Sequence, residues 1–383
     1  MIDPARFVDH CTNVGIELFA GVPDSLLKSF NAQLMHTLPR EQHVITANEG
    51  AAVGLALGHH LRTGRPGLVY LQNSGFGNVI NPLLSLADPD VYGIPMVLVV
   101  GWRGQPGVTD EPQHVKQGRI QEQLIDALEL PWAVLPGDDR DAEACLRRAV
   151  DVALERSCPY VLLVPKGTFA EPPDGAAAAG YGPSAEETAT REEALEALID
   201  ALGPGTVNIS TTGMLSRELF ELRAAADDVG SLDFLTVGGM GHASSIAFGV
   251  AMGEPEREVW CLDGDGALLM HLGVLPVIAD HAPANLFHVV FNNGVHDSVG
   301  GQPTSISQVR VAEAARALGY GWAASTSDPG ELPELVTRMR HAGGPCLLEI
   351  RVRPGSRPGL GRPTRTPRES KAAFMKAIST ERT

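Results

Sequence analysis

Short apolar runs alternate with amphipathic segments along the whole chain. The runs Val259–Leu262 and Leu286–Phe291 are typical of buried strands, and the segment Ala267–Ala279 between them is typical of a helix. A strand, a crossover helix and a second strand form a parallel pair, so both strands end at the same edge of a sheet. We therefore expect the residues that follow the two runs to lie close together.

Polar turns follow both of these strands. The first is Gly264-Asp265-Gly266, and the second contains Asn293, which lies 28 positions after Asp265. Carboxylate and amide oxygens suit Mg²⁺, which usually takes its other ligands from phosphate and water. The pattern predicts a magnesium and diphosphate site, although two ordinary turns at strand ends would give the same residues.

The same alternation extends to both halves of the chain and predicts an α/β fold with two doubly wound parallel sheets. Helices are expected at residues 4–15, Leu26–Leu34, after Glu49-Gly50, and at Arg191–Leu202. The other expected strands are Ile16–Ala20, His43–Ala47, Leu68–Leu71, Met96–Val100, Val161–Val164, Val207–Ser210, Leu235–Met240 and Cys346–Val352.

A stretch rich in Ala, Gly and Pro separates the two halves and has the composition of a linker. We expect a first domain at residues 1–170, a linker at 171–190 and a second domain at 191–383 that ends in a basic tail.

Charge and cysteine content narrow the function. The net charge of −16 argues against nucleic-acid binding, and an anionic substrate would need a local cationic pocket. Five cysteines without a CxxC pair indicate neither a disulfide framework nor a zinc site. The start of the chain does not have the pattern of a signal peptide, and no apolar run is long enough to span a membrane. We expect a cytoplasmic protein that binds no nucleic acid and no membrane.

The GDG turn and the NN pair at this spacing resemble the cofactor signature of thiamine diphosphate enzymes. Such an enzyme also needs a carboxyl group beside the pyrimidine ring and an apolar wedge that bends the cofactor. Glu49 follows a predicted buried strand among small residues, where burial would raise its pKa. Met240 stands between glycines and is the candidate wedge. A helix-start charge at Glu49 and core filler at Met240 are the alternatives.

Eight segments resemble those of phosphonopyruvate decarboxylases, and the likeness covers nearly the whole chain. They are GVPDSLLK (21–28), ANEGAA (47–52), NSGFGN (73–78), DEPQHVKQGRI (110–120), GGMGHASSIA (238–247), GDG (264–266), NNGVHDSVGGQPT (292–304) and GLGRPT…TP (359–367). The resemblance implies a pyrimidine-binding domain, then a diphosphate-binding domain without a middle domain, and the cofactors thiamine diphosphate and Mg²⁺. It also implies a homodimer or a dimer of dimers with sites between subunits.

The resemblance assigns roles to individual residues. The side chains of Asp265 and Asn293 and the carbonyl of Val295 would bind Mg²⁺, and Glu49 would face the pyrimidine. The remaining residues implied to bind the cofactor are Asn73, Ser74, Thr212, Gly213, Gly238, Met240, Gly264, Gly266 and Ala267.

The implied reaction is the decarboxylation of a small anionic 2-keto acid, 3-phosphonopyruvate, in phosphonate biosynthesis. The substrate candidates that we favour are Asp24, Ser25, His114 and Gln302, and the others are Asn78, Arg103, Lys116, His296 and Ser298. The alternatives that stay open are a sulfopyruvate decarboxylase, a carboligase, and a non-catalytic protein, either an α/β binder of magnesium and nucleotide or an assembly subunit.

Overall fold

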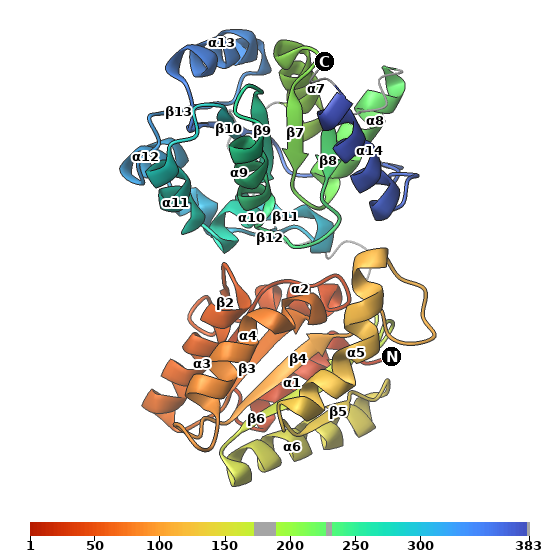
Figure 1. The fold of residues 1–383 in the computed structure, drawn as a ribbon. Helices are drawn as coiled ribbons and strands as arrows, with labels where there is room; N and C mark the ends of the chain where they lie inside the picture. The colour runs from red at the N-terminus through yellow and green to blue at the C-terminus, as the bar shows by residue number, and fades with distance from the viewer. Residues whose placement is uncertain (172–188, 227–231, 381–383) are drawn as a thin grey trace. The chain divides into compact units, whose positions relative to one another are not determined.

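The chain forms two compact units, Met1–Gly180 and Tyr181–Thr383 (Figure 1). The computed structural model describes residues 1–171, 189–226 and 232–380. Most of the predicted linker, residues 171–190, lies outside the described residues, so its conformation stays a prediction. Thr190, the last residue of that stretch, is the N-cap of the first helix that follows.

The first unit contains a six-stranded parallel sheet with the strand order β2-β1-β3-β4-β6-β5. The order reverses between β1 and β3, where the chain crosses to the other face of the sheet. Its strands are β1 (Phe19–Gly21), β2 (His43–Ile45), β3 (Gly67–Gln72), β4 (Met96–Gly101), β5 (Trp132–Val134) and β6 (Pro159–Val164).

Helices cover both faces of this sheet, and each face has its own apolar core. Helices α1 (Pro4–Asn13), α2 (Lys28–Thr37) and α6 (Asp139–Arg156) pack on one face. Helices α3 (Glu49–Thr63), α4 (Phe76–Pro82) and α5 (Pro112–Ala127) pack on the other, with the short helices η1 (Asn73–Gly75) and η2 (Leu83–Ala87) flanking α4.

The second unit repeats this plan with a sheet in the order β13-β14-β10-β9-β7-β8, again parallel throughout. The strands are β7 (Val207–Ser210), β8 (Asp233–Leu235), β9 (Val259–Gly264), β10 (Leu286–Asn292), β13 (Trp322–Thr326) and β14 (Cys346–Arg351). A small antiparallel pair, β11 (Val295–His296) and β12 (Gln302–Pro303), follows β10.

Helices again form two layers. One face carries α9 (Ala243–Gly253), α10 (Asp265–Met270), α11 (Val274–His281), α12 (Val311–Ala317) and α14 (Pro367–Thr380). The other carries α7 (Arg191–Leu202), α8 (Met214–Ala225) and α13 (Leu332–Ala342). Short helices η3 (Asp297–Val299), η4 (Ser305–Gln308) and η5 (Pro329–Glu331) complete the described chain. The predicted fold, two doubly wound parallel α/β sheets, is confirmed.

Several predicted boundaries were wrong. The expected strand Leu235–Met240 is a loop apart from its first residue, because β8 ends at Leu235 and glycines at 238, 239 and 241 follow. The expected helix Ala267–Ala279 is interrupted at residues 271–273 and forms α10 and α11. Helix α2 begins at Lys28, two residues after the expected start at Leu26, and the Asp24 side chain accepts from the Leu26 amide at 3.1 Å.

Candidate functional site

Asp265 and Asn293 come to the same edge of the second sheet, as the sequence predicts. Strands β9 and β10 are neighbours, and Gly264 at the end of β9 lies opposite Phe291. Thr304 connects the two turns, since its hydroxyl donates to Asp265 and its amide donates to the Gly294 carbonyl at 2.8 Å.

The electrostatics of this edge fit a divalent cation. Asp265 is buried, and burial raises its pKa to about 7. A carboxylate buried in this way is costly unless a positive charge compensates it. Asn293 is also buried, and its Oδ1 accepts weakly from the Val295 amide at 3.2 Å, which leaves a lone pair for another partner. A hard cation beside these two oxygens would satisfy both groups.

A second part of the same edge suits an anionic phosphate. Helix α8 follows β7, and its N-cap is Gly213, which provides no side-chain cap for the helix amides. Its φ of 107° is a conformation that glycine adopts readily. The preceding turn is fixed by Ser216, whose hydroxyl donates to the Thr211 carbonyl at 2.6 Å. The amides and the dipole of such a helix start attract phosphate.

Met240, Gly266 and His296 form a tight contact above the GDG turn. A Cβ atom at Gly266 would lie 2.9 Å from His296 Cε1 and 3.3 Å from Met240 Cε. Burial lowers the pKa of His296 to about 4, so the imidazole is neutral near pH 7. The candidate wedge, Met240, therefore lies next to the predicted cofactor turn, and Gly266 is the residue type that leaves room for it.

In the first unit, Glu49 begins helix α3 and is 5% exposed. Burial raises its pKa, and a hydrogen bond from Asn78 partly opposes that rise. Asn78 Nδ2 donates to Glu49 Oε2 at 2.7 Å, while the backbone of Gly75 lies against the other oxygen, because a Cβ there would be 2.0 Å from Oε1. Glu49 is thus buried as predicted, but its surroundings are not wholly apolar.

Two connected polar groups lie at the carboxyl edge of the first sheet. In the first, Asp24 is fully buried and accepts from Gln72 Nε2 at 2.5 Å, and Ser74 donates to Gln72 Oε1 at 2.6 Å. Burial raises the pKa of Asp24, with Gln72 and Arg103 opposing the rise. The backbone of Gly101, at the end of β4, leaves the space for this carboxyl group.

Arg103 is the centre of the second group. Its Nη1 donates to Ser25 Oγ at 2.8 Å, and its Nε donates to Asp110 Oδ2 at 2.7 Å. Asn73 fixes the backbone of Arg103 through two hydrogen bonds of 2.8 and 3.1 Å. His114 is buried, and its pKa is lowered first by burial and then by the charge of Arg103. Three residues chosen from sequence, Ser25, Asn73 and Arg103, therefore form one polar cluster with Asp110, the Arg103 cluster.

Comparison with known proteins assigns this architecture to a family. Residues 5–130 match the thiamine pyrophosphate enzyme N-terminal TPP binding domain, and residues 212–350 match the C-terminal TPP binding domain. A phosphonopyruvate decarboxylase of Streptomyces viridochromogenes is 37% identical over 99% of this chain and 96% of its own. The chain belongs to the phosphonopyruvate decarboxylase family of thiamine pyrophosphate enzymes.

Two further relatives match along almost the whole chain. A phosphonopyruvate decarboxylase of Streptomyces hygroscopicus is 38% identical over 98% of this chain and 93% of its own. A sulfopyruvate decarboxylase of Methanosarcina acetivorans is 25% identical over 98% of both chains. The cofactor of the family is thiamine diphosphate (thiamine pyrophosphate), which the enzymes generally hold with a divalent metal ion such as Mg²⁺.

The remaining substrate candidates of this decarboxylase family member differ in burial. Lys116 and Ser298 are exposed. Gln302 is fully buried opposite His296 in the β11–β12 pair, and neither of its amide atoms has a hydrogen-bond partner among the described residues. A buried unpartnered amide is unusual and is consistent with a polar group that binds there.

Sequence reasoning missed some of the contacts at these sites. Asn78, a candidate for the substrate, donates to Glu49, and its role toward the substrate stays a prediction. Asp110 and Gln72, which orient Arg103 and Asp24, were not predicted. The DEPQ stretch that contains Asp110 was the available signal.

One buried group of metal-binding residue types was also missed, because its members are not a CxxC pair. The ligand atoms of Cys261, Asp263 and His288 lie within 4.8 Å of one another. His288 and Cys261 are neighbours across β9 and β10, and His288 Nε2 is 3.4 Å from Asp263 Oδ2. All three side chains are buried. Asp263 Oδ1 accepts from the Gly264 amide at 2.9 Å, whereas Asp263 Oδ2 and both ring nitrogens of His288 have no hydrogen-bond partner among the described residues.

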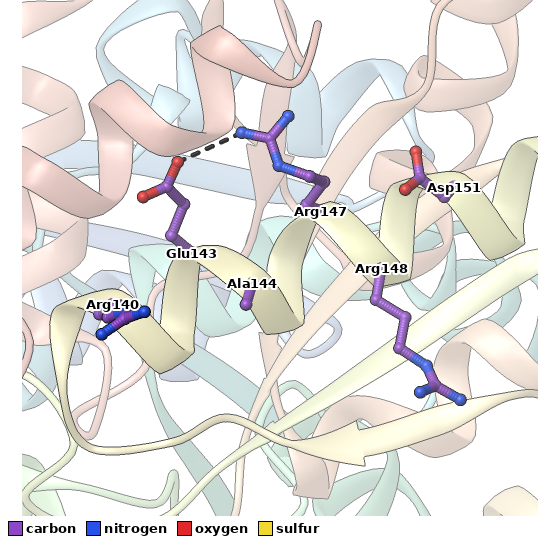
Figure 2. A pocket seen from close by; sticks show the side chains of 6 residues that line it. All are labelled: Arg140, Glu143, Ala144, Arg147, Arg148 and Asp151. Atoms are coloured by element: carbon purple, nitrogen blue, oxygen red, sulfur yellow. Dashed lines mark hydrogen bonds and ion pairs between the residues drawn. The ribbon is translucent and has the colours of Figure 1, made fainter.

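A surface hollow of about 420 Å³ lies on helix α6 (Figure 2). Its lining residues are Arg140, Glu143, Ala144, Arg147, Arg148 and Asp151. All belong to the solvent-facing side of one helix, where Arg147 pairs with Glu143. We regard it as a charged helix surface. Within the described residues, we find no helix with the length and apolar character that a bilayer span requires.

Proposed function

We propose that this protein decarboxylates 3-phosphonopyruvate to phosphonoacetaldehyde and CO₂, with thiamine diphosphate and Mg²⁺ as cofactors. The observation that supports this most is the similarity to two phosphonopyruvate decarboxylases over almost the entire length of the chain. The buried Glu49 in one unit and the Asp265–Asn293 pair in the other are the two features that the cofactor requires.

The second unit would hold the metal and the diphosphate. Asp265, Asn293 and the Val295 carbonyl would bind Mg²⁺, while Gly264, Gly266, Ala267, Thr212 and Gly213 would surround the diphosphate. Met240 would support the bend of the cofactor, and the Gly238 carbonyl would accept a hydrogen bond from its amino group.

The first unit would control a proton. When bound, the cofactor supplies a nucleophilic carbon and an electron sink for the decarboxylation. Glu49 would hold a proton on its carboxyl group toward the pyrimidine nitrogen. Its raised pKa suits this role because burial favours the protonated form, while Asn78 keeps one oxygen fixed.

The anionic substrate would contact the Arg103 cluster. Ser25 and Arg103 offer donors at the sheet edge, and His114 lies beside them. Asp24 would not repel a phosphonate if it is protonated, which its raised pKa favours. Gln302 in the second unit is a further candidate donor, since its amide has no protein partner among the described residues.

Assembly is part of the proposal. Glu49 and Asp265 belong to different units of the chain. We expect a homodimer, or a dimer of dimers, in which each site combines Glu49 of one subunit with Asp265 of another.

The test is turnover of phosphonopyruvate by the purified protein with Mg²⁺ and thiamine diphosphate, measured as CO₂ release and aldehyde formation. Sulfopyruvate and pyruvate are the competing substrates. We expect Glu49→Gln to lose at least about 100-fold in kcat, the lower range for a positioned acid or base. The surface variant Glu17→Gln, which carries the same substitution in the same unit, should keep its activity.

Two outcomes would contradict the proposal. Faster turnover of sulfopyruvate than of phosphonopyruvate would assign the protein to the activity named for its archaeal relative. Rapid decarboxylation by Glu49→Gln would remove the role given to that residue.

A further inference from the structure

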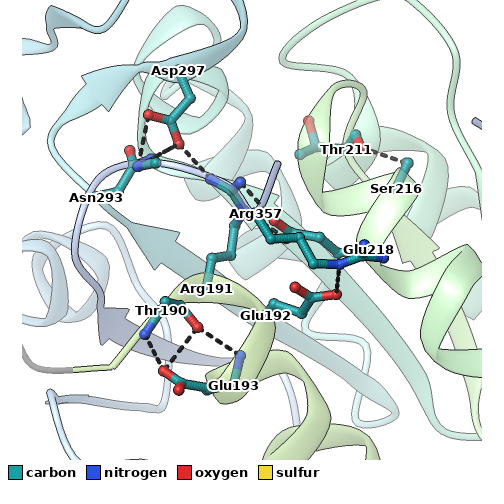
Figure 3. Close-up of polar contacts among 11 residues, drawn as sticks. Thr190, Arg191, Glu192, Glu193, Thr211, Ser216, Glu218, Asn293, Asp297 and Arg357 are labelled. Carbon is teal, nitrogen blue, oxygen red and sulfur yellow. Dashed lines mark hydrogen bonds and ion pairs between the residues drawn. The ribbon is translucent and has the colours of Figure 1, made fainter. Parts of the chain in front are cut away.

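Asn293 is the end of a buried chain of polar side chains in the second unit (Figure 3). Its Nδ2 donates to Asp297 Oδ2 at 2.6 Å, and Arg191 Nη1 donates to the same oxygen at 2.9 Å. Arg191 is the first residue of helix α7, and Asp297 is the first residue of η3, so residues 106 positions apart meet at this point.

The neighbours of Asn293 select one orientation of its amide group. Asp297 is a carboxylate and can only accept, so it faces the Nδ2 donor. The Val295 amide can only donate, so it faces Oδ1. A flipped amide would place two acceptors together on one side and two donors together on the other. The oxygen of Asn293 is therefore kept on the side of the Val295 amide, and its nitrogen on the side of Asp297.

Asp297 is itself held in place by three partners, Asn293, Arg191 and the Gly355 amide. Arg191 binds it with one nitrogen and binds Glu218 with two others, at 2.8 and 2.9 Å. The Gly355 amide donates to Asp297 Oδ1 at 3.1 Å. The side chain of Arg191 is 8% exposed and that of Glu218 is 1% exposed, so the fork of Arg191 is fixed by buried partners.

The charge of Arg191 has a second effect. Asp297 follows Asn293 by four positions, and its carboxylate contacts the Asn293 amide directly. A free carboxylate at this position could bind a cation directly or repel a diphosphate. Arg191 occupies one oxygen of Asp297 and compensates its charge.

We propose that Arg191 and Asp297 are positioning residues for the divalent cation, which fix the metal-binding oxygen of Asn293 and keep Asp297 from acting as a ligand. This inference rests on the proposed metal site at Asp265 and Asn293. Neither residue touches the reacting atoms.

The same unit contains a matched triad that serves as a control. Asn208 Nδ2 donates to Asp233 Oδ1 at 2.7 Å, and Arg223 Nε donates to Asp233 Oδ2 at 2.9 Å. This Asn-Asp-Arg group has the same three residue types and a buried aspartate, but it lies at the start of strand β8, opposite the carboxyl edge.

The experiment measures Mn²⁺ binding to the full-length protein with thiamine diphosphate and without substrate, from the electron paramagnetic resonance signal of free Mn²⁺. The variants are Asp297→Asn, Arg191→Lys, Asp233→Asn and Asp265→Asn. Thermal unfolding midpoints in a chelator report structural damage separately. Loss of a partner that orients a metal ligand typically weakens metal binding about 10- to 100-fold.

We expect Asp297→Asn to weaken Mn²⁺ binding in that range, and Asp233→Asn to leave the affinity within about twofold. Arg191→Lys keeps the charge, but a lysine cannot bridge Glu218 and Asp297, so this variant should also weaken Mn²⁺ binding. If Asp297→Asn does not fold, Arg191→Lys serves as the test variant in its place. Equal affinities in Asp297→Asn or Arg191→Lys and in the control would overturn the inference. Unchanged binding in Asp265→Asn would instead overturn the proposed metal site.

Discussion

At the scale of single residues, Glu49 shows how local structure sets chemical behaviour. Asn48 caps helix α3 by accepting from the Ala51 amide at 3.0 Å, which fixes the position of the next residue. Glu49 is thereby placed at the helix start with its carboxyl group buried. A free glutamate would be ionised at neutral pH, whereas burial favours the protonated form here.

This burial predicts a pH dependence of stability in the cofactor-free protein. The pKa of Glu49 is raised above its ordinary 4.5 in the folded state, so its contribution to stability is full below that pH. The contribution is then lost as pH rises through the higher folded pKa. Glu49→Gln cannot ionise, so its free energy of unfolding should increase relative to wild type from pH 4 to pH 8. Urea denaturation across this range measures the difference, and a constant difference would contradict the prediction.

At the scale of elements, the turn between β3 and α4 is built around the same carboxyl group. Gly75 ends η1, and its backbone approaches Glu49 more closely than any side chain would allow. Gly77, two residues later in α4, has no atom within 4 Å of the position that a Cβ would take. A side chain at position 75 would therefore collide with Glu49, whereas position 77 has room for one.

Gly75→Ala should displace the Glu49 carboxylate and reduce kcat by about 10-fold or more, since small misplacements of a catalytic group are costly. Gly77→Ala should keep activity and raise the free energy of unfolding by about 0.5–1 kcal/mol, because alanine favours the helix. Steady-state kinetics and urea denaturation of both variants test this pair. Equal kcat values in the two variants would show that the turn does not hold the carboxyl group.

Elements with a strong apolar pattern could be predicted from sequence, and elements fixed by side-chain partners could not. Strand β9 and its GDG turn were found because the apolar run ends sharply at polar residues. The segment after Leu235 was predicted as a strand because Leu235, Val237 and Met240 are apolar, but the glycines at 238, 239 and 241 end the strand. The Thr236 hydroxyl, which donates to the Ser210 carbonyl at 2.8 Å, is a partner that the apolar pattern does not indicate.

The same limit applies to the candidate site. Asp265 and Asn293 could be paired from strand order alone, because parallel neighbours share an edge. Arg191 and Asp297 could not, because their contact depends on side-chain directions across more than a hundred positions. The roles of these residues toward cofactor and substrate remain predictions.

At the scale of the whole molecule, the chemistry is divided between the two units. The first unit carries the buried acid, Glu49, and the Arg103 cluster. The second carries the predicted metal and diphosphate site. If each site combines two subunits, defects in different units can compensate each other.

We expect Glu49→Gln and Asp265→Asn to be inactive separately and to recover activity when combined in one dimer. In such a dimer one site carries both substitutions and the other carries neither, so turnover should reach about half of the wild-type value. Co-expression with two different affinity tags and sequential purification isolates the mixed dimer. No recovery in that mixed dimer would show that each site is formed within one chain.

The apolar cores have a consequence for how the protein can be encoded. All members of each of the four apolar clusters in the described residues belong to a single unit, and each unit contains two of the clusters. The apolar clusters of each unit are thus formed by residues of that unit alone. A gene interrupted between them, translated as two polypeptides, should still supply everything that is needed to rebuild a working enzyme.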